Sequence, residues 1–221
     1  MKNVCGVLGL AMMAASCGGS AAGQARQPQW HVIYLHGRIV QEQQDPRPRH
    51  PDFGMYELES ILEALRGAGF VVSGEIRPRA VSVEQWADRT VDQVRGFLGR
   101  GVPASRITVV GASMGGGIAL QTAVRLQNPD VRFAVLGVCL SAQVPRLVSQ
   151  EGKGPVGRVL SIREASDETT EPCERWTSSS AGSGFKVREL VLRTGLRHGF
   201  LYRPLPEWVQ PVTEWAKTPA P

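Results

Sequence analysis

From Trp30 onward the chain alternates between two patterns of hydrophobic and polar residues. One pattern is a short apolar run rich in β-branched residues, and the other is a longer segment whose apolar residues recur three or four positions apart. The short runs predict strands buried on both faces, because a strand with one solvated face alternates apolar and polar residues. The expected strands are 30–37, 70–78, 106–113, 131–142, 157–167 and 186–195.

The longer segments predict helices, at 55–69, 82–101, 115–128 and 205–217. Ser82 and Gln85 have the spacing of a capping box, which marks the start of the second helix. Gly67 and Gly69 are typical stop signals for the first helix. Pro211 is expected to interrupt or kink the last helix, because proline lacks the backbone donor of a helical hydrogen bond.

The order of these elements predicts the fold class. Strands that alternate with helices are joined by right-handed crossovers and form a parallel sheet. Residues 30–218 are therefore expected to fold as one α/β domain, a doubly wound, mostly parallel sheet of about six strands flanked by helices. A length of 221 residues suits one such domain with a substantial core.

The N-terminal residues have a different composition from this domain. One early lysine is followed by an apolar run and then by small residues, which is typical of a secretory signal. The stretch Ala14–Cys17 resembles a bacterial lipoprotein cleavage site, so residues 1–16 are expected to be removed and Cys17 to be lipidated. Residues 17–29 would then form a flexible tether. Cleavage near Ala22 and an uncleaved N-terminus are the alternatives.

Export would place the domain in the periplasm or cell envelope, with a lipid on Cys17 as its only expected attachment to a membrane. Such a compartment permits disulfides, and Cys139 and Cys173 either form one or stay unpaired. They belong to no C-x-x-C motif or Cys/His cluster, so no metal site is expected. The net charge of +5 comes from scattered Lys and Arg residues, which argues against nucleic acid as a partner.

Polar side chains follow three of the expected strands, at the edge where parallel sheets bind ligands. Ser113 follows the third strand, Asp167 the fifth and His198 the sixth. Ser113 lies in Gly-Ala-Ser-Met-Gly, a G-x-S-x-G pattern between a strand and a helix. Small residues two positions before and after a serine permit a tight turn that exposes its hydroxyl. Glu164 and Glu168 are the alternatives to Asp167 as the acidic residue.

These motifs make the domain resemble the α/β-hydrolase superfamily. The stretches IYLHGRIVQEQ, ITVVGASMGGGIAL, SIREASDE and TGLRHGFLYRPLPEWV are similar to a little-characterised bacterial branch of it. The resemblance implies a reduced α/β-hydrolase fold without the two strands that usually precede the first one. It also implies a shallow, open site without a cap domain, because only residues 141–157 separate the fourth strand from the fifth.

The resemblance further implies a catalytic triad. In it Ser113 attacks a carbonyl carbon, His198 transfers the proton and Asp167 orients the histidine. The backbone amides of Met114 and Arg38 would bind the oxyanion. Neither a cofactor nor a metal ion is expected for this chemistry.

Several residues near the strand ends are candidates for contacts with the substrate. The polar loop over residues 38–54 contributes arginines that favour a substrate with a carboxylate or phosphate, and a solvated rim is the alternative. Phe200 and Tyr202 either line the pocket or pack in the core. His36 is expected to hold the oxyanion loop by hydrogen bonds. The full set is His36, Gly37, Arg47, Arg49, Arg77, Phe200 and Tyr202.

The function that these features favour is hydrolysis of carboxylic esters in small or exposed substrates, through an acyl-enzyme. A thioesterase or a peptidase would use the same three residues, and the pocket decides among them. A hypothesis from another class is a non-catalytic envelope lipoprotein that uses this fold for binding. The strained serine turn argues against it, because a binding module does not need that turn. The oligomeric state stays open.

Overall fold

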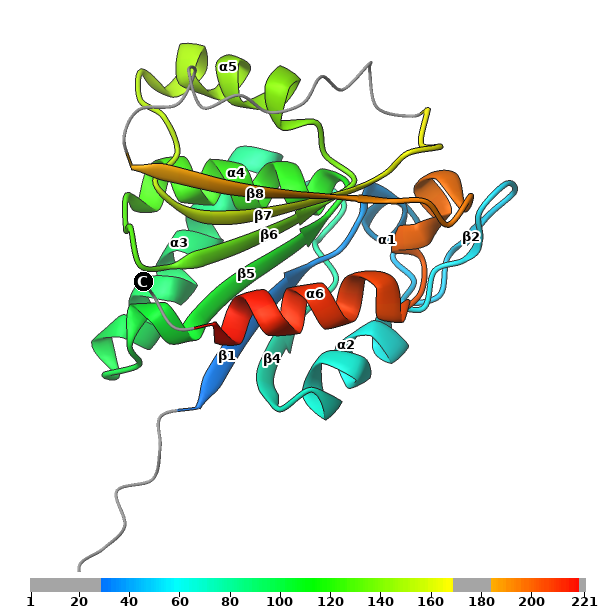
Figure 1. Ribbon diagram of the computed structural model, residues 1–221, viewed down its shortest axis with the longest axis horizontal. Helices are drawn as coiled ribbons and strands as arrows, with labels where there is room; N and C mark the ends of the chain where they lie inside the picture. The colour runs from blue at the N-terminus through cyan, green and yellow to red at the C-terminus, as the bar shows by residue number, and fades with distance from the viewer. Residues whose placement is uncertain (1–28, 169–183, 219–221) are drawn as a thin grey trace, which may run out of the picture.

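The computed structural model describes residues 29–168 and 184–218. Their central feature is a six-stranded sheet in the order β4-β1-β5-β6-β7-β8, in which every neighbouring pair is parallel (Figure 1). The strands are β1 (Trp30–Leu35), β4 (Phe70–Gly74), β5 (Ile107–Ala112), β6 (Arg132–Leu136), β7 (Gly157–Glu164) and β8 (Phe185–Leu192). The predicted doubly wound parallel sheet is thus confirmed.

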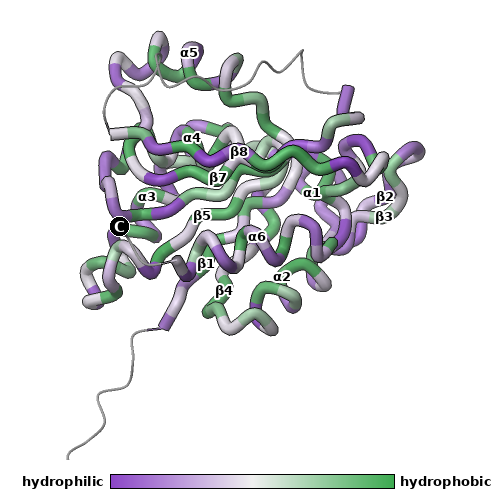
Figure 2. Tube along the Cα trace, in the orientation of Figure 1, coloured by the Kyte–Doolittle hydropathy of each residue, from purple (hydrophilic) through white to green (hydrophobic). Residues whose placement is uncertain are grey.

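Helices cover both faces of this sheet (Figure 1). One face carries α2 (Leu58–Gly67) and α6 (Pro206–Lys217), and the other carries α3 (Val83–Gly99), α4 (Met114–Leu126) and α5 (Leu140–Glu151). Successive residues of a strand pack on opposite faces of the sheet. Tyr34 packs in the core with α2 and α6, whereas Ile33 and Leu35 pack in the core with α3, α4 and α5. Burial on both faces explains why the central strands are continuous apolar runs, which are green in Figure 2.

The structure shows what the predicted capping box and the helical proline do. Ser82 and Gln85 form a complete capping box at the start of α3, as predicted. Pro211 lies within α6, which continues on both sides of it, so the proline does not interrupt this helix. Pro211 is the sixth residue of α6, so the helix continues past it without the one backbone hydrogen bond that proline cannot donate.

The predicted strand 131–142 is too long. Strand β6 ends at Leu136, and helix α5 begins at Leu140. The turn between them depends on Gly137, whose φ of +64° is unfavourable for a residue with a side chain. The apolar run continues past this glycine because the start of α5 is also buried, and Leu140 is 0% exposed. Hydropathy alone therefore did not separate the strand from the helix.

The segment between β1 and α2 departs most from the sequence prediction. A loop is expected over residues 38–54, but the structure forms helix α1 (Arg38–Gln43) and an antiparallel pair of strands there, β2 (Arg49–His50) and β3 (Gly54–Met55). We call the unit from Arg49 to Met55 the hairpin. It lies beside the carboxyl ends of the large sheet (Figure 1).

The predicted signal peptide at 1–16 and the predicted lipidation site Cys17 lie outside the described residues. So does the predicted tether at 17–29, apart from Gln29. Within 29–168 and 184–218, no helix has the length and apolar character needed to cross a membrane.

Candidate active site

The candidate site lies at the carboxyl ends of β1 and β5, which are neighbours in the sheet. The chain leaves β1 towards β4 on one side and leaves β5 towards β6 on the other. Neighbouring strands whose connections diverge leave a crevice beyond their carboxyl ends, which is where open α/β sheets bind ligands. Gly37 and Arg38 follow β1 at this crevice, and Ser113 follows β5.

Ser113 lies on a sharp turn between β5 and α4, with φ 53° and ψ −119°. Backbone of this kind is strained for a residue with a side chain. A Cβ atom at Gly111 would lie 2.1 Å from the carbonyl oxygen of Gly115, and one at Gly115 would lie 2.0 Å from that of Leu35. Both positions therefore require glycine, because β1, β5 and α4 approach one another too closely for any side chain.

Three side chains from separate elements form a hydrogen-bonded chain. His198 lies in the short 3-10 helix η3 (Arg197–Leu201) after β8, and its Nε2 atom is 2.9 Å from the Ser113 Oγ atom. Its Nδ1 atom is 2.6 Å from the Asp167 Oδ2 atom. With Nδ1–H donating to the carboxylate, Nε2 is the acceptor for the serine hydroxyl, as a general base requires. The Asp167 side chain is only 2% exposed, so little water competes for the carboxylate.

The acidic residues near the end of β7 differ in their surroundings. Glu164 is buried and accepts hydrogen bonds from the backbone and hydroxyl groups of Thr194 and Ser166. Burial acts to raise the pKa of this carboxyl, but the hydrogen bonds outweigh burial and hold the pKa below its ordinary value. Glu164 thus joins the ends of β7 and β8 as a carboxylate. Glu168 is exposed, and Asp167 is the one of the three that contacts His198.

The backbone amides of Arg38 and Met114 lie at the starts of α1 and α4. Amides in the first turn of a helix have no intrahelical acceptor. A Cβ atom at Gly37 would lie 3.8 Å from the Ser113 Cβ atom, so the loop after β1 passes directly beside the serine. The start of the 13-residue helix α4 also favours negative charge at this point.

Arg77, expected on the substrate rim, is instead buried behind the loop that follows β1, with 1% of its surface exposed. Its Nη2 atom donates to the carbonyl oxygens of His36 and Gly37, at 2.6 and 3.3 Å. Its Nε atom donates to the Gln41 side chain at 3.1 Å. Burial lowers the pKa of the guanidinium to about 10, so it stays charged at neutral pH. The rim prediction for Arg77 is wrong because these carbonyl groups, which the sequence does not reveal, draw the side chain inward.

His36 is buried in the same network. Its Nδ1 atom lies 2.8 Å from the carbonyl oxygen of Gly37, and its Nε2 atom accepts a hydrogen bond from the Arg77 backbone at 3.0 Å. Burial and the neighbouring Arg77 charge lower the pKa of the imidazole to about 3. The ring is therefore neutral at pH 7, with its proton on Nδ1. It holds the backbone of the loop and does not face Ser113.

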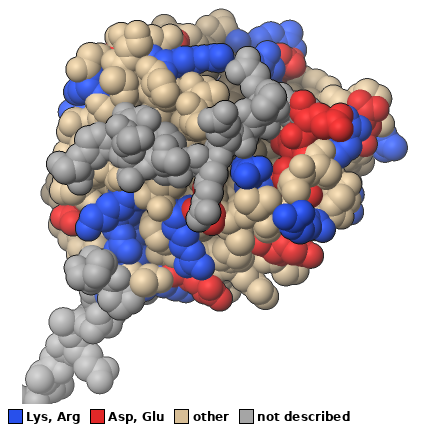
Figure 3. Space-filling model, turned by 45° about the horizontal axis from the view of Figure 1, so that its top comes forward, with Lys and Arg blue, Asp and Glu red and all other residues tan. Residues whose placement is uncertain are grey.

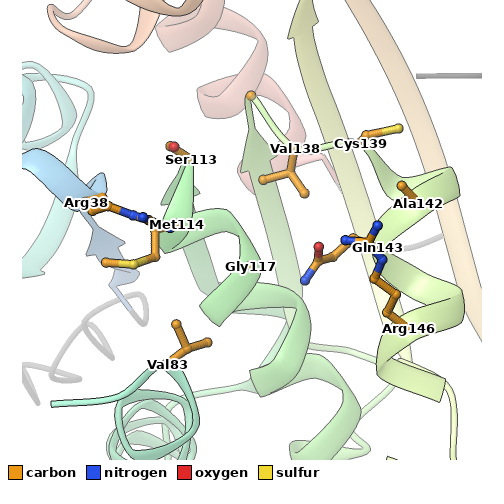
Figure 4. Close-up of a pocket in the computed structure, with 11 residues that line it drawn as sticks. Arg38, Val83, Ser113, Met114, Gly117, Val138, Cys139, Ala142, Gln143 and Arg146 are labelled. Carbon is orange, nitrogen blue, oxygen red and sulfur yellow. The ribbon is translucent and has the colours of Figure 1, made fainter. Parts of the chain in front are cut away.

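Two cavities of about 470 Å³ each meet at Ser113. The first, here called the α5 cavity, is shown in Figure 4. Besides Ser113, its lining includes Arg38, Val83, Met114, Val138, Ala142, Gln143 and Arg146. The second, here called the hairpin cavity, includes Gly37, Arg38, Arg49, His50, Phe53, Tyr56, His198 and Tyr202 in its lining.

Two further predicted substrate contacts are not found at either cavity. The Arg47 guanidinium contacts the Met55 sulfur, and Phe200 is fully buried in the core formed with α2 and α6. Phe200 packs inward together with Leu201, its apolar neighbour in η3, as part of this core. Tyr202, by contrast, is 5% exposed and lines the hairpin cavity.

Sequence reasoning missed Phe53, Gly137 and Gln143. Phe53 is an aromatic residue within a polar loop, and such an isolated aromatic side chain could have been taken as a sign of a contact. Gly137 has little space around it, because an added Cβ atom would lie 3.2 Å from the His198 ring. Gln143 carried no signal, because α5 was not predicted.

Cys139 is disulfide-bonded. The sequence leaves open whether Cys139 pairs with Cys173, and Cys173 lies outside the described residues. Across residues 29–168 and 184–218, no group of three or more His, Cys, Asp or Glu side chains could hold a metal ion.

No protein-family model matches this chain, and no curated protein matches its sequence. Solved structures do match. One of the metagenome-derived lipolytic enzymes LipS and LipT is 13% identical over 86% of this chain and 94% of its own, with a TM-score of 0.56. Est1E from Butyrivibrio proteoclasticus is 13% identical over 88% of each chain, with a TM-score of 0.53.

A hyperthermophilic esterase from the archaeon Pyrobaculum calidifontis is 18% identical over 84% of this chain and 74% of its own, with a TM-score of 0.53. At such low identities the likeness concerns the fold. Together with the strand order and the serine turn, it shows that this chain has the α/β-hydrolase fold.

Proposed function

We propose that the protein is a serine hydrolase that cleaves carboxylic esters. The observation that carries the proposal is the hydrogen-bonded chain from Asp167 through His198 to Ser113 at a strained turn. A binding module gains nothing from this strain, whereas a nucleophile needs the exposed hydroxyl that the turn provides. The esterase and lipolytic enzymes that share the fold support the same class of reaction.

In the proposed reaction, the Ser113 Oγ atom attacks the carbonyl carbon while His198 Nε2 takes the hydroxyl proton. The amides of Arg38 and Met114 bind the oxyanion, and loss of one such donor typically costs about 3 kcal/mol. His198 then returns the proton to the departing alcohol, which leaves an acyl group on Ser113. Water attacks this acyl-enzyme with the same help from His198. Asp167 keeps the imidazole in the required tautomer.

The proposed substrates are small esters or exposed ester groups. Each of the two cavities has room for a short chain or a ring, at about 470 Å³. Thioesters and amides are the alternatives that use the same residues. The proposed envelope location, with Cys17 lipidated, rests on the sequence of residues 14–17. Incorporation of an alkyne fatty acid into the wild type and its loss in Cys17→Ser would test it.

The function is tested by hydrolysis of p-nitrophenyl acetate by the purified protein. Ser113→Ala is expected to lower kcat by at least about 10³-fold, and Asp167→Asn by about 10⁴-fold, because the latter favours the wrong imidazole tautomer. Glu168→Gln is the matched control, since it removes the charge of the exposed neighbour. Undiminished turnover by Ser113→Ala would assign the activity to another group. A folded wild type that cleaves no ester, thioester or amide would favour a binding role.

A further inference from the structure

The two cavities at Ser113 differ in the reacting groups that line them. His198 lines the hairpin cavity but not the α5 cavity. Met114, whose amide is one proposed oxyanion donor, lines the α5 cavity but not the hairpin cavity. Ser113 lies at the boundary, since it lines both. A substrate attacked by Ser113 therefore has its two halves in different surroundings.

The position of His198 decides which half lies on which side. When the tetrahedral intermediate breaks down, the bond from the acyl carbon to the alcohol oxygen breaks, and this oxygen takes the proton from His198 Nε2. The alcohol oxygen must then lie within hydrogen-bond reach of His198, so the rest of the alcohol extends into the hairpin cavity. The acyl chain leaves the carbonyl carbon in another direction, towards the α5 cavity.

The hairpin cavity has walls that are rich in aromatic rings. The Phe53 ring stacks on His50, with centroids 4.5 Å apart and 19° between the planes. It meets Tyr202 edge-on at 5.6 Å and lies 6.1 Å from the His198 ring. Tyr56 and Tyr202 continue the wall, with centroids 5.2 Å apart. Walls of this kind favour flat apolar groups, which stack on or pack edge-to-face against the rings.

The α5 cavity has a different lining. Val83, Met114 and Ala142 are apolar, Gln143 and Arg146 are polar, and none of the described residues that line it is aromatic (Figure 4). Within residues 29–168 and 184–218, its lining therefore offers no aromatic surface that would select a ring, and it suits a short acyl chain.

We propose that the hairpin cavity is the leaving-group subsite and selects esters of aromatic or other flat, apolar alcohols, while a short acyl chain occupies the α5 cavity. This inference rests on the proposed hydrolase function and adds the chemical class of the alcohol. The hairpin, through Phe53, is the element that supplies this selectivity.

The test separates acylation, which depends on the alcohol, from deacylation, which does not. Benzyl acetate and n-butyl acetate form the same acetyl-enzyme and release alcohols of similar acidity, so their ratio of kcat/KM measures alcohol selectivity. Phe53→Ala is expected to reduce the preference for benzyl acetate by about tenfold. The rate of acetyl-enzyme breakdown, measured by rapid quench and mass spectrometry, is expected to stay the same.

Ala142→Phe is the matched variant on the other side of Ser113. It is expected to lower kcat/KM for p-nitrophenyl hexanoate relative to p-nitrophenyl acetate without changing the alcohol preference, because the added ring fills the α5 cavity. Phe53→Leu removes the ring but keeps an apolar side chain. It is the second variant to measure in case Phe53→Ala disturbs the folding of the hairpin. All rates are divided by the fraction of enzyme labelled by a fluorophosphonate.

Two results would overturn the assignment. If Phe53→Ala alters acyl-chain preference or deacylation and leaves alcohol preference intact, the two cavities have the opposite roles. If neither Phe53 variant changes any selectivity, the hairpin is not a subsite. Failure of the proposed function is distinguishable, because the wild type would then cleave no ester, or Ser113→Ala would retain activity.

Discussion

The peptide between Gly37 and Arg38 is held in place by hydrogen bonds to its carbonyl oxygen. Its carbonyl oxygen lies 2.8 Å from His36 Nδ1 and 3.3 Å from Arg77 Nη2. In a trans peptide the N–H points away from the carbonyl oxygen, so these bonds fix the direction of the Arg38 amide. Donors on the carbonyl also polarise the peptide and make its N–H a better donor. A buried charge is costly to desolvate, and Arg77 contacts backbone carbonyls in place of a carboxylate. We therefore expect Arg77 to position the Arg38 amide, which is one of the proposed oxyanion donors.

Arg77→Met removes these donors and keeps a side chain of similar length. It is expected to lower kcat by about 10–100-fold with little change in KM, because the misplaced amide acts mainly in the transition state. Arg77→Lys, which restores a cation and donors, is expected to recover part of kcat. The measurement is kcat and KM per labelled active site, together with Tm. Normal kcat in Arg77→Met at normal KM would contradict this role.

His36 gives a pH dependence of stability whose sign can be worked out. Its pKa is about 3 in the folded protein and near 6.5 when unfolded, so the unfolded state binds the extra proton between these values. Its contribution to the free energy of unfolding is complete above pH 6.5 and is lost as pH falls towards 3. The His36→Gln variant is therefore expected to lose less stability than the wild type between pH 7 and pH 5. Urea unfolding at both pH values measures this, and parallel losses would contradict the buried neutral imidazole.

At the scale of elements, the serine turn depends on how closely β1, β5 and α4 pack. Gly115 is enclosed by the backbone of β1, whereas an added Cβ atom at Gly117, half a turn further along α4, would lie 3.9 Å from the nearest atom, Gln143 Nε2. An added methyl group would therefore clash with the backbone at Gly115 but would make only an ordinary contact at Gly117.

Gly115→Ala is expected to prevent native packing at the turn and to abolish activity, because its Cβ atom would overlap the Leu35 carbonyl oxygen. Gly117→Ala is the control. It is expected to fold with an equal or higher Tm, since alanine stabilises a helix interior by about 0.5–1 kcal/mol relative to glycine. Circular dichroism melts and fluorophosphonate labelling of both variants would check this. Equal stability and labelling of the two variants would show that the close approach at Gly115 is not required.

The strands and the main helices could be predicted from the sequence, because burial on both faces of a strand leaves a continuous apolar run and burial of one stripe of a helix leaves a periodic pattern. The ends of β5, β7 and β8 then indicated Ser113, Asp167 and His198. The hairpin and α5 gave no comparable signal, since β2 and β3 have two residues each and the α5 sequence begins within an apolar run. Phe53 and Arg77 depend on contacts between distant segments, which local patterns do not encode.

At the scale of the whole molecule, two cores on opposite faces of one sheet support a site built from loops at a single edge. Lys and Arg side chains are interspersed with Asp and Glu on the face shown in Figure 3. This mixture fits a small-molecule substrate better than a polyanion on that face.

The disulfide-bonded Cys139 lies at the N-cap of α5. Of the other cysteines, Cys5 lies in the predicted signal and Cys17 is predicted to be lipidated, so Cys173 is the expected partner. A bridge that closes a loop of this length contributes roughly 4 kcal/mol in the chain-entropy account. Peptide mapping without reduction is expected to find the Cys139 and Cys173 peptides linked. Alkylation of both cysteines without prior reduction would contradict the pairing.

Covalent labelling with a fluorophosphonate reports directly whether Ser113 is an activated nucleophile. The wild type and Ser113→Ala would be treated with a fluorophosphonate and examined by intact-mass spectrometry and peptide mapping. If His198 activates Ser113, one adduct per wild-type chain is expected, on the peptide that contains Ser113, and none on Ser113→Ala. A folded wild type that stays unlabelled, or an adduct that persists in Ser113→Ala, would contradict this activation.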